Sequence, residues 1–202
     1  LDEYLSTTPL IKNGRLYQNE LRRITALIHS WLDIEKLRAP FKVKSLEQWD
    51  DVTVEGLTLK VRADRIDVLE DNSHLIIDYK TGGYVSQSQW LGDRPEEPQL
   101  PLYSTISDLD VNSVAFGQLN ATQVGFSGLA SGGDIAPGIL PLDDVSSRLN
   151  VADDCGQQQA QWKGTMDALV SDYKSGHAVV DPRKPEVCRL CQLQPFCRIH
   201  SR

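Results

Sequence analysis

The sequence has few sulfur-containing residues and no long apolar stretch: it contains one Met and four Cys among 202 residues. No apolar run approaches the roughly 20 residues that a transmembrane helix needs, which argues against a membrane-spanning protein. No segment reads as a secretory signal peptide, so nothing points to export. Hydrophobic residues make up 40% of the chain and charged residues 24%. This composition predicts one soluble domain with a sizeable core, spanning residues 1–202.

Positive charge is also in short supply. The chain has 21 Lys and Arg against 28 Asp and Glu, for a net charge of −7 and a pI near 5.1. A non-specific nucleic-acid binder is usually basic, so the total charge argues against that class. The charge is uneven, however: residues 104–156 hold seven Asp and one Arg, whereas residues 183–202 hold five basic residues and one acid. The total can therefore hide a local basic face.

Cysteine is unevenly placed as well as scarce. Cys155 stands alone, whereas Cys188, Cys191 and Cys197 lie within ten residues. A disulfide framework is usually spread more widely, so this grouping indicates a reducing compartment and a metal or cluster site. We therefore expect a cytoplasmic protein in which residues 182–202 form a cysteine-rich closing segment.

Apolar residues recur with both helical and strand periods, which predicts an α/β fold with a central mixed β-sheet flanked by helices. The 16–38 stretch is amphipathic, and Pro40 ends it. Residues 75–80, "LIIDYK", are apolar on both faces and therefore form a central strand. The other expected elements are strands at 41–49, 52–70 and 111–120, a turn at 70–73, helices starting within 96–106 and covering 157–175, and a Gly-rich loop at 127–156.

Charged residues interrupt the apolar pattern in "ADRIDVLEDNSHLIIDYKTGG", residues 63–83. Residues two apart on a strand share a face, so Asp78 and Lys80 project together. Asp64 lies on the preceding strand of the same hairpin, where cross-strand pairing can bring it close to Asp78. The apolar phase flips after Ala63, which indicates a bulge or twist near Asp64, and bulges are common beside active sites.

Two adjacent carboxylates repel each other unless a cation lies between them. Mg²⁺ suits this arrangement, because it is a hard ion that takes few carboxylate ligands and fills its remaining positions with water or phosphate oxygens. A neighbouring lysine can orient the attacking water or stabilise charge on phosphorus. The pattern thus predicts metal-assisted phosphodiester hydrolysis. The simpler alternative is that Asp78 and Lys80 form an ordinary solvated ion pair.

The segments "ADRID", "IIDYKTG" and "PQLPLY" together resemble the PD-(D/E)XK nuclease superfamily, in its RecB/AddB-like exonuclease branch. The resemblance covers about residues 30–200 and implies a restriction-endonuclease-like core. One departure is Val61, where the family often has Gly.

The resemblance also implies the site residues. Two acids match the metal-binding positions for Mg²⁺ or Mn²⁺, the lysine matches the catalytic one, and a Q-x-x-x-Y motif would lie near the scissile phosphate. An acid on the strand before the hairpin matches an upstream acid often found in this branch, and the carbonyl of the residue before the lysine is a candidate extra metal ligand. In the order of these roles, the residues are the acids Asp64 and Asp78, the lysine Lys80, the motif residues Gln99 and Tyr103, the upstream acid Glu47, and Tyr79. Alternatively, Glu47 is a surface acid, and Gln99 and Tyr103 are a helix start and a half-buried aromatic residue.

Several other residues have plain structural alternatives. We expect Arg65 and Asp67 to form a structural ion pair. Trp90 and Arg94 follow the lysine strand and could clamp a nucleic-acid strand or simply pack in their loop.

In the resembling family, three closing cysteines join an upstream fourth to hold a four-iron four-sulfur cluster. By this resemblance Cys188, Cys191 and Cys197 are cluster ligands near the N-terminal helix. The fourth ligand either precedes Leu1 or is replaced by Cys155 or His200. Zinc on the three cysteines and His200, or three unliganded thiols, are the alternatives.

The resemblance implies a Mg²⁺-dependent DNA nuclease, an exonuclease of recombination or repair. It would act with a helicase-like domain or subunit at the bacterial nucleoid, as the C-terminal module of a larger protein. The alternative is a catalytically silent DNA-binding or scaffolding module that retains the fold.

Overall fold

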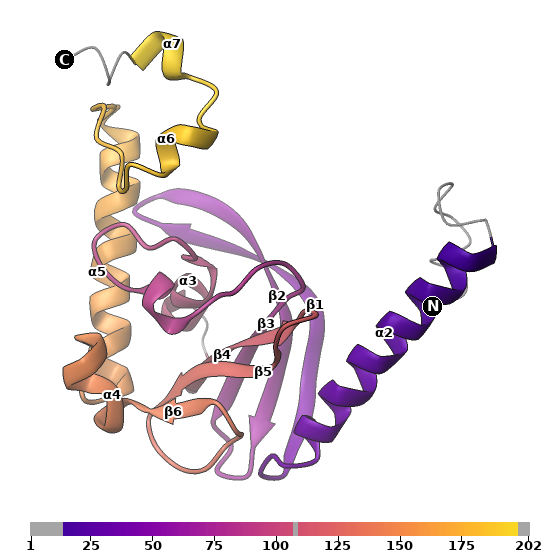
Figure 1. The fold of residues 1–202 in the computed structure, drawn as a ribbon. Helices are drawn as coiled ribbons and strands as arrows, with labels where there is room; N and C mark the ends of the chain where they lie inside the picture. Colours follow the sequence, from indigo (N-terminus) through magenta and orange to yellow (C-terminus); the bar gives the residue numbers. More distant parts are fainter. Residues whose placement is uncertain (1–13, 107–108, 198–202) are drawn as a thin grey trace.

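The computed structural model describes residues 14–106 and 109–197. Six strands form one sheet in sequential order (Figure 1). β3–β4 and β5–β6 are parallel pairs and the other neighbours are antiparallel, so the predicted mixed sheet is confirmed. The strands are β1 (Phe41–Val54), β2 (Leu57–Leu69), β3 (His74–Lys80), β4 (Val111–Leu119), β5 (Val124–Ala130) and β6 (Ile139–Pro141).

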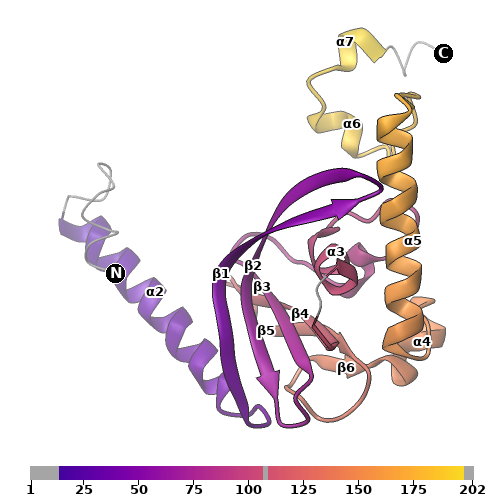
Figure 2. The same ribbon diagram turned by 180° about the vertical axis from the view of Figure 1, so that it is seen from behind.

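Helices lie on both faces of the sheet, and Figures 1 and 2 show that α2 (Gly14–Glu35) contacts its face near its C-terminal end while its N-terminal part projects away. α3 (Gln99–Ile106), α4 (Leu142–Leu149) and α5 (Cys155–Lys174) pack on the other face. Three short helical segments complete the described chain: η1 (Gln87–Trp90), α6 (Val187–Leu190) and α7 (Gln194–Cys197). Within these ranges no helix is both long and apolar enough to cross a membrane.

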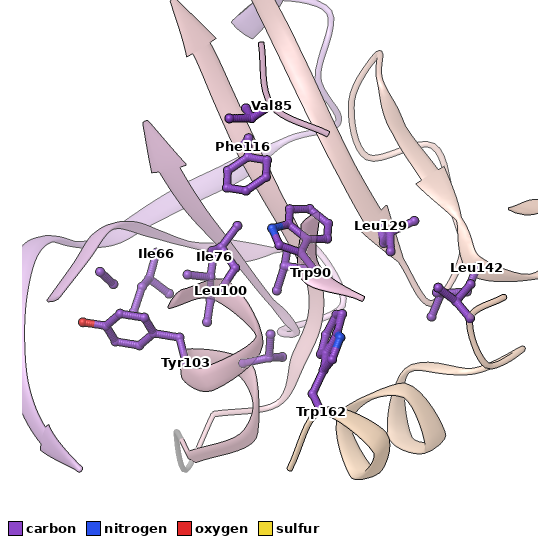
Figure 3. Close-up of a cluster of buried hydrophobic side chains, with 14 of the residues drawn as sticks. Ile66, Ile76, Val85, Trp90, Leu100, Tyr103, Phe116, Leu129, Leu142 and Trp162 are labelled. Atoms are coloured by element: carbon purple, nitrogen blue, oxygen red, sulfur yellow. The ribbon is translucent and has the colours of Figure 1, made fainter. Parts of the chain in front are cut away.

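The larger core lies between the sheet and α3–α5 (Figure 3). Trp90 is fully buried there, with its ring 4.7 Å from that of Phe116 and 6.5 Å from that of Trp162. Of the two alternatives given for Trp90, this burial excludes stacking on a nucleic-acid strand, because the ring has no solvent-facing surface. Arg94 donates hydrogen bonds to the Asp181 carbonyl and carboxylate. The loop-packing alternative is the one that the structure supports.

The opposite face carries a buried ionic network beside the last turn of α2. Arg65 donates to Asp67 at 2.7 Å and Arg38 donates to the other Asp67 oxygen at 2.8 Å. Glu35 accepts from both arginines, and Arg65 also donates to the Tyr79 hydroxyl. The predicted Arg65–Asp67 ion pair is confirmed, and it anchors α2 to β2.

β1 and β2 form a hairpin whose turn lies inside the strand expected at 52–70. The expected single strand at 52–70 is interrupted at Glu55 and Gly56, whose φ values of 46° and 74° are those of a two-residue hairpin turn. Val54 packs with Met166 of α5, and the Lys174 ammonium donates to the Glu55 carbonyl. The hairpin tip is therefore held against α5.

The predicted loop at 127–156 is also wrong, because it contains most of β5 together with β6 and α4. Its glycines allow close strand packing: a Cβ on Gly128 would lie 2.7 Å from the Ala115 Cβ. Elsewhere the expected helices at 16–38 and 157–175, the strand at 75–80 and the turn at 70–73 agree with the structure to within a few residues. Gly176 follows α5 with φ 73°, the expected helix stop.

Candidate active site

The sheet places Asp64 and Asp78 side by side. β2 pairs with β3 through Arg65–Ile77 and Ile66–Ile76, so the next position in this register sets Asp64 opposite Asp78. Asp64 Oδ2 accepts a hydrogen bond from the Tyr79 amide at 2.8 Å. The structure thus brings together the two acids that the sequence singled out.

Asp78 is the more enclosed acid, with 8% of its side chain exposed against 15% for Asp64. Burial raises the pKa of Asp78, and the negative charges of Asp64 and Glu97 add to this effect, while Lys80 opposes it. No hydrogen bond of good geometry reaches Asp78 Oδ2, although the Lys80 ammonium lies 2.9 Å away. A buried carboxylate oxygen of this kind is suited to a cation.

Lys80 lies between two acids. Its Nζ is 2.9 Å from Asp78 Oδ2 and 2.7 Å from Glu97 Oε2, with 23% of the side chain exposed. Burial alone would lower the pKa of Lys80, but the contacts with Glu97 and Asp78 outweigh it and raise the pKa. Lys80 is therefore positively charged at neutral pH and held toward the acid pair.

Glu97 is a site residue that the sequence reasoning missed. Its backbone amide donates to the Gln89 carbonyl at 3.1 Å, which fixes the loop before α3 over Lys80. The available signal was its position, two residues before the Gln of the Q-x-x-x-Y motif. Its contact with Lys80 joins residues 17 positions apart in the sequence, and no strand or helix period encodes the path of the loop between them.

Gln99 and Tyr103 place α3 beside the acids. The Gln99 side-chain amide donates to the Arg62 carbonyl at 2.8 Å, two residues before Asp64. Tyr103 is 3% exposed, and its buried hydroxyl has no hydrogen-bond partner (Figure 3). Burial raises the Tyr103 pKa, with further contributions from nearby carboxylates that include Asp64. The tyrosine is therefore neutral and close to the acid pair.

Glu47 lies opposite Asp64 in the β1–β2 ladder, between the pairs Leu46–Arg65 and Gln48–Ala63. Its φ of 51° is left-handed, a conformation that costs a non-glycine residue roughly 1–3 kcal/mol. The Glu47 carboxylate pairs with Arg62 Nη1 at 2.7 Å. Arg62, which the sequence reasoning also missed, lies 3.9 Å from Asp64 Oδ1 through its other terminal nitrogen.

The bulge expected near Asp64 is present. The β1–β2 register shifts between Val43 and Ser45, which pair with Asp67 and Ile66. The bulge is thus on β1, opposite positions two and three residues beyond Asp64, and the left-handed Glu47 is the irregular residue opposite Asp64 itself.

The acid pair fits a small hard cation. Mg²⁺ commonly takes only one or two protein carboxylates and keeps water on its other positions. Asp78 Oδ2 lacks a well-aligned donor, and Asp64 Oδ1 has only the distant Arg62 contact among those described. The Tyr79 amide points to β2, and the carbonyl of a strand residue points to the same side as its amide. Across residues 14–106 and 109–197, no three His, Cys, Asp or Glu side chains gather as a metal site, so any cation here relies on few side chains.

The cysteine-bearing segment lies away from the position that the sequence predicted. Figures 1 and 2 show α6 and α7 beyond the C-terminal end of α5, on the opposite side of the molecule from α2. The expectation that the cysteines lie near the N-terminal helix is therefore wrong. Cys188 is buried, Cys191 is exposed and Cys197 is half-buried, and none of the three is in a disulfide.

Cys155 is too distant to complete a cluster with these three. It begins α5, whose 20 residues span about 30 Å at 1.5 Å per residue, and the other cysteines follow the far end of that helix. Its Sγ donates instead to the Asn112 carbonyl at 3.2 Å. His200 lies outside the described residues, so the iron–sulfur assignment and its zinc alternative stay predictions.

Comparison with known proteins identifies the family. The model of the PD-(D/E)XK nuclease superfamily matches residues 2–198. The chain belongs to the PD-(D/E)XK nuclease superfamily. As a member of it, the chain carries its two strand acids and the following lysine on a mixed sheet flanked by helices, which is the fold that the sequence predicted.

The other comparisons add less. No curated protein matches the chain. A solved structure described as "Crystal structure of SSO0001" shares 16% identity, with 88% of this PD-(D/E)XK chain and 67% of that chain covered and a TM-score of 0.41.

Proposed function

We propose that this PD-(D/E)XK protein is a Mg²⁺- or Mn²⁺-dependent deoxyribonuclease, an exonuclease of the RecB/AddB-like branch. One observation carries the proposal: Asp64 and Asp78 face each other across paired strands, and a charged Lys80 lies 2.9 Å from Asp78. Burying two carboxylates together is unfavourable unless a cation compensates for their charge. If Lys80 only neutralised Asp78, the Asp64 carboxylate would have no cation, among the residues that the structure describes, closer than Arg62, which lies 3.9 Å away.

Asp64, Asp78 and the Tyr79 carbonyl are the groups that would hold the cation. A bound Mg²⁺ or Mn²⁺ would polarise a phosphoryl oxygen and lower the pKa of a bound water. The protein's own contribution is to fix these oxygens on adjacent strands, where the Tyr79 amide holds the Asp64 carboxylate in place.

Lys80 would act on the reacting phosphate. Its raised pKa keeps it charged, and Asp78 and Glu97 hold its ammonium in one position. A preorganised cation stabilises negative charge as it develops on phosphorus, and an ammonium can also orient a water molecule. Gln99 positions α3 by its hydrogen bond to Arg62, and the neutral Tyr103 hydroxyl remains available as a donor.

The wider role rests on the sequence resemblance. We include in the proposal a role in DNA recombination or repair at the nucleoid, a helicase-like partner domain or subunit, and a four-iron four-sulfur cluster on Cys188, Cys191 and Cys197. A fold alone does not specify these, because related folds host different activities.

The proposal is tested with end-labelled linear DNA, both single- and double-stranded, incubated with Mg²⁺, with Mn²⁺ and with a chelator. We expect metal-dependent cleavage by the wild type, with labelled nucleotides released progressively from an end. Lys80→Ala should lower kcat more than tenfold while leaving DNA affinity and the folded state intact; tenfold corresponds to about 1.4 kcal/mol of barrier.

Lys60→Ala is the matched control, because Lys60 is an exposed lysine on β2. It should cleave like the wild type. Absence of cleavage by the folded wild type under either metal, or equal activity of the Lys80 and Lys60 variants, would contradict the proposal. Cleavage only at internal positions would retain the nuclease and remove the exonuclease assignment.

A further inference from the structure

Trp49 is unlike the other tryptophans of the chain. It is 64% exposed, whereas Trp31, Trp90 and Trp162 are 6%, 0% and 6% exposed. Burying a large aromatic side chain is strongly favourable, so a tryptophan left in solvent gives up a substantial stabilisation. The exposure of Trp49 on β1 therefore points to a contact with a molecule outside the folded chain.

Trp49 is linked to the candidate active site through one side chain. It pairs with Arg62 across the β1–β2 ladder, and the Arg62 guanidinium lies over its ring at 5.4 Å from the centroid. The same guanidinium pairs with Glu47 at 2.7 Å and lies 3.9 Å from Asp64. An exposed ring and a 44% exposed cation thus stand next to the acid pair.

The hairpin that carries Trp49 is fixed at both ends. Its tip is held against α5 through Val54, Met166 and the Lys174 contact with the Glu55 carbonyl. Nearer the acids, Gln99 of α3 holds the Arg62 carbonyl. A ligand on Trp49 would therefore bind a preorganised surface, which lowers the ordering cost of binding.

We propose that Trp49 and Arg62 form a stacking platform for an unpaired base of single-stranded DNA next to the scissile phosphate. The identity of the ligand rests on the proposed nuclease function. Stacking on an aromatic ring is tolerant of sequence and suits a strand that is being degraded. Bases inside a duplex are already stacked on each other, so the platform accepts single strands or frayed ends.

The charge of the chain favours stacking over phosphate contacts. Phosphate-based binding needs several unpaired Lys or Arg side chains, and this chain has a net charge of −7. Beside the acids, Arg62 is already partly neutralised by Glu47. The face of a base offers binding energy that does not depend on positive charge.

The first test uses the native tryptophan as the probe. Lys80→Ala protein of residues 1–202 in chelator-containing buffer, which prevents metal-dependent cleavage during the measurement, is titrated with a short oligothymidylate, with an abasic strand of equal length and with a blunt duplex. Acrylamide quenching then reports on Trp49, because the other three tryptophans are buried. Oligothymidylate should protect Trp49, and the abasic strand and duplex should not.

Equal protection by the abasic strand, or no protection by any DNA, would overturn the proposal. Protection that appears on raising the protein concentration without DNA would identify a second copy of the chain as the occupant, and would overturn it too.

The second test compares variants by fluorescence anisotropy of a labelled oligothymidylate. Trp49→Ala should weaken binding about 5- to 150-fold, the range of aromatic stacking by one base, and Trp49→Phe should restore much of it. Leu46→Ala is the control, because Leu46 is 63% exposed on the same strand. Equal affinities for Trp49→Ala and Leu46→Ala would exclude the platform.

Cleavage by the wild type is measured separately, so the two proposals fail separately. Cleavage without protection of Trp49 would leave the nuclease and remove the platform. Protection without cleavage would leave the platform and remove the nuclease.

Discussion

Asp78 is a charged side chain whose burial costs stability. Its carboxylate is buried beside two other acids, and its pKa is raised because burial disfavours the charged form. Evolution normally removes such a group from a core unless it has a use.

This pKa shift predicts a pH-dependent effect of Asp78→Asn in chelator-containing buffer. At low pH the carboxyl is protonated in both the folded and the unfolded chain, so it costs nothing. As pH rises through the ordinary aspartate pKa, the Asp78 carboxyl ionises first in the unfolded chain. The resulting loss of folding stability grows with pH and reaches its full size above the raised pKa of the folded state. The variant should therefore gain thermal stability relative to the wild type between about pH 4 and pH 7. A gain that shrinks as pH rises would contradict this.

Glu97 offers a second residue-scale prediction. Glu97→Gln keeps the shape of the side chain but removes the charge that holds Lys80, so we expect kcat to fall about 10- to 100-fold with KM nearly unchanged. The neighbouring Glu96 pairs instead with Arg183 and Lys184, so Glu96→Gln is the control and should retain activity. Similar kcat values for the two variants would show that Glu97 does not position Lys80.

At the scale of elements, the connection between β5 and β6 depends on a glycine. Gly138 has φ 91°, and a Cβ there would lie 2.2 Å from the Phe126 carbonyl oxygen. Gly133 has a similar φ of 80° but open space around it. The two glycines share a backbone conformation and differ in packing.

Gly133→Ala should lower the free energy of unfolding by about 1–2 kcal/mol, the cost of a left-handed Cβ. Gly138→Ala should lower it by a further 1–3 kcal/mol because of the clash. Urea denaturation of the two variants measures the difference. Equal losses would mean that β6 moves away from Phe126 without penalty.

The hairpin around the acids was readable from sequence because its signals are local. Apolar side chains on both parities of "LIIDYK" predict a strand covered on both faces, and Leu75, Ile76 and Ile77 are fully buried. The phase flip after Ala63 predicted a bulge or twist near Asp64, and a bulge is present nearby, although it lies on β1 opposite Ile66 and Asp67. The turn at Glu55–Gly56 was missed although the apolar positions change parity there, from Val54 to Leu57, because Glu-Gly is not one of the residue pairs usually found in such a turn.

Other features were set by long-range packing, which sequence periods do not record. Trp90 follows a loop-like segment but is drawn into the core by Phe116 and Trp162. The strand of residues 124–130 has Gly at two positions, which lowers its strand propensity, yet the sheet buries it. Contacts between Lys80 and Glu97 and between Arg62 and Glu47 arise only once the strands and the loop have assembled.

At the scale of the whole molecule, the cysteines occupy chemically distinct places. Cys191 is exposed, whereas burial raises the pKa of the Cys155 thiol and its Sγ donates to the Asn112 carbonyl. A raised pKa leaves less thiolate at pH 8, and thiolate is the reactive form.

We therefore expect iodoacetamide to modify Cys191 at least tenfold faster than Cys155 in the folded, metal-free protein. Peptide mass spectrometry over a time course measures both rates, and the rates in denaturant provide the reference. Comparable rates before unfolding would place Cys155 in a more open environment than its burial indicates.

The ionic network behind the sheet has a consequence for how the protein avoids misfolding. Asp64 faces α3, while its neighbours Arg65 and Asp67 engage Glu35 and Arg38 on the reverse side. Sliding β2 by one position would send every side chain to the opposite face. Arg65 and Asp67 would then enter the apolar layer on the other face without Glu35 and Arg38, so the pair would be buried with part of its hydrogen bonding lost, at a cost of several kcal/mol. The network therefore selects the observed pairing register of β2, because a chain that pairs one residue out of register is destabilised by the loss of these contacts.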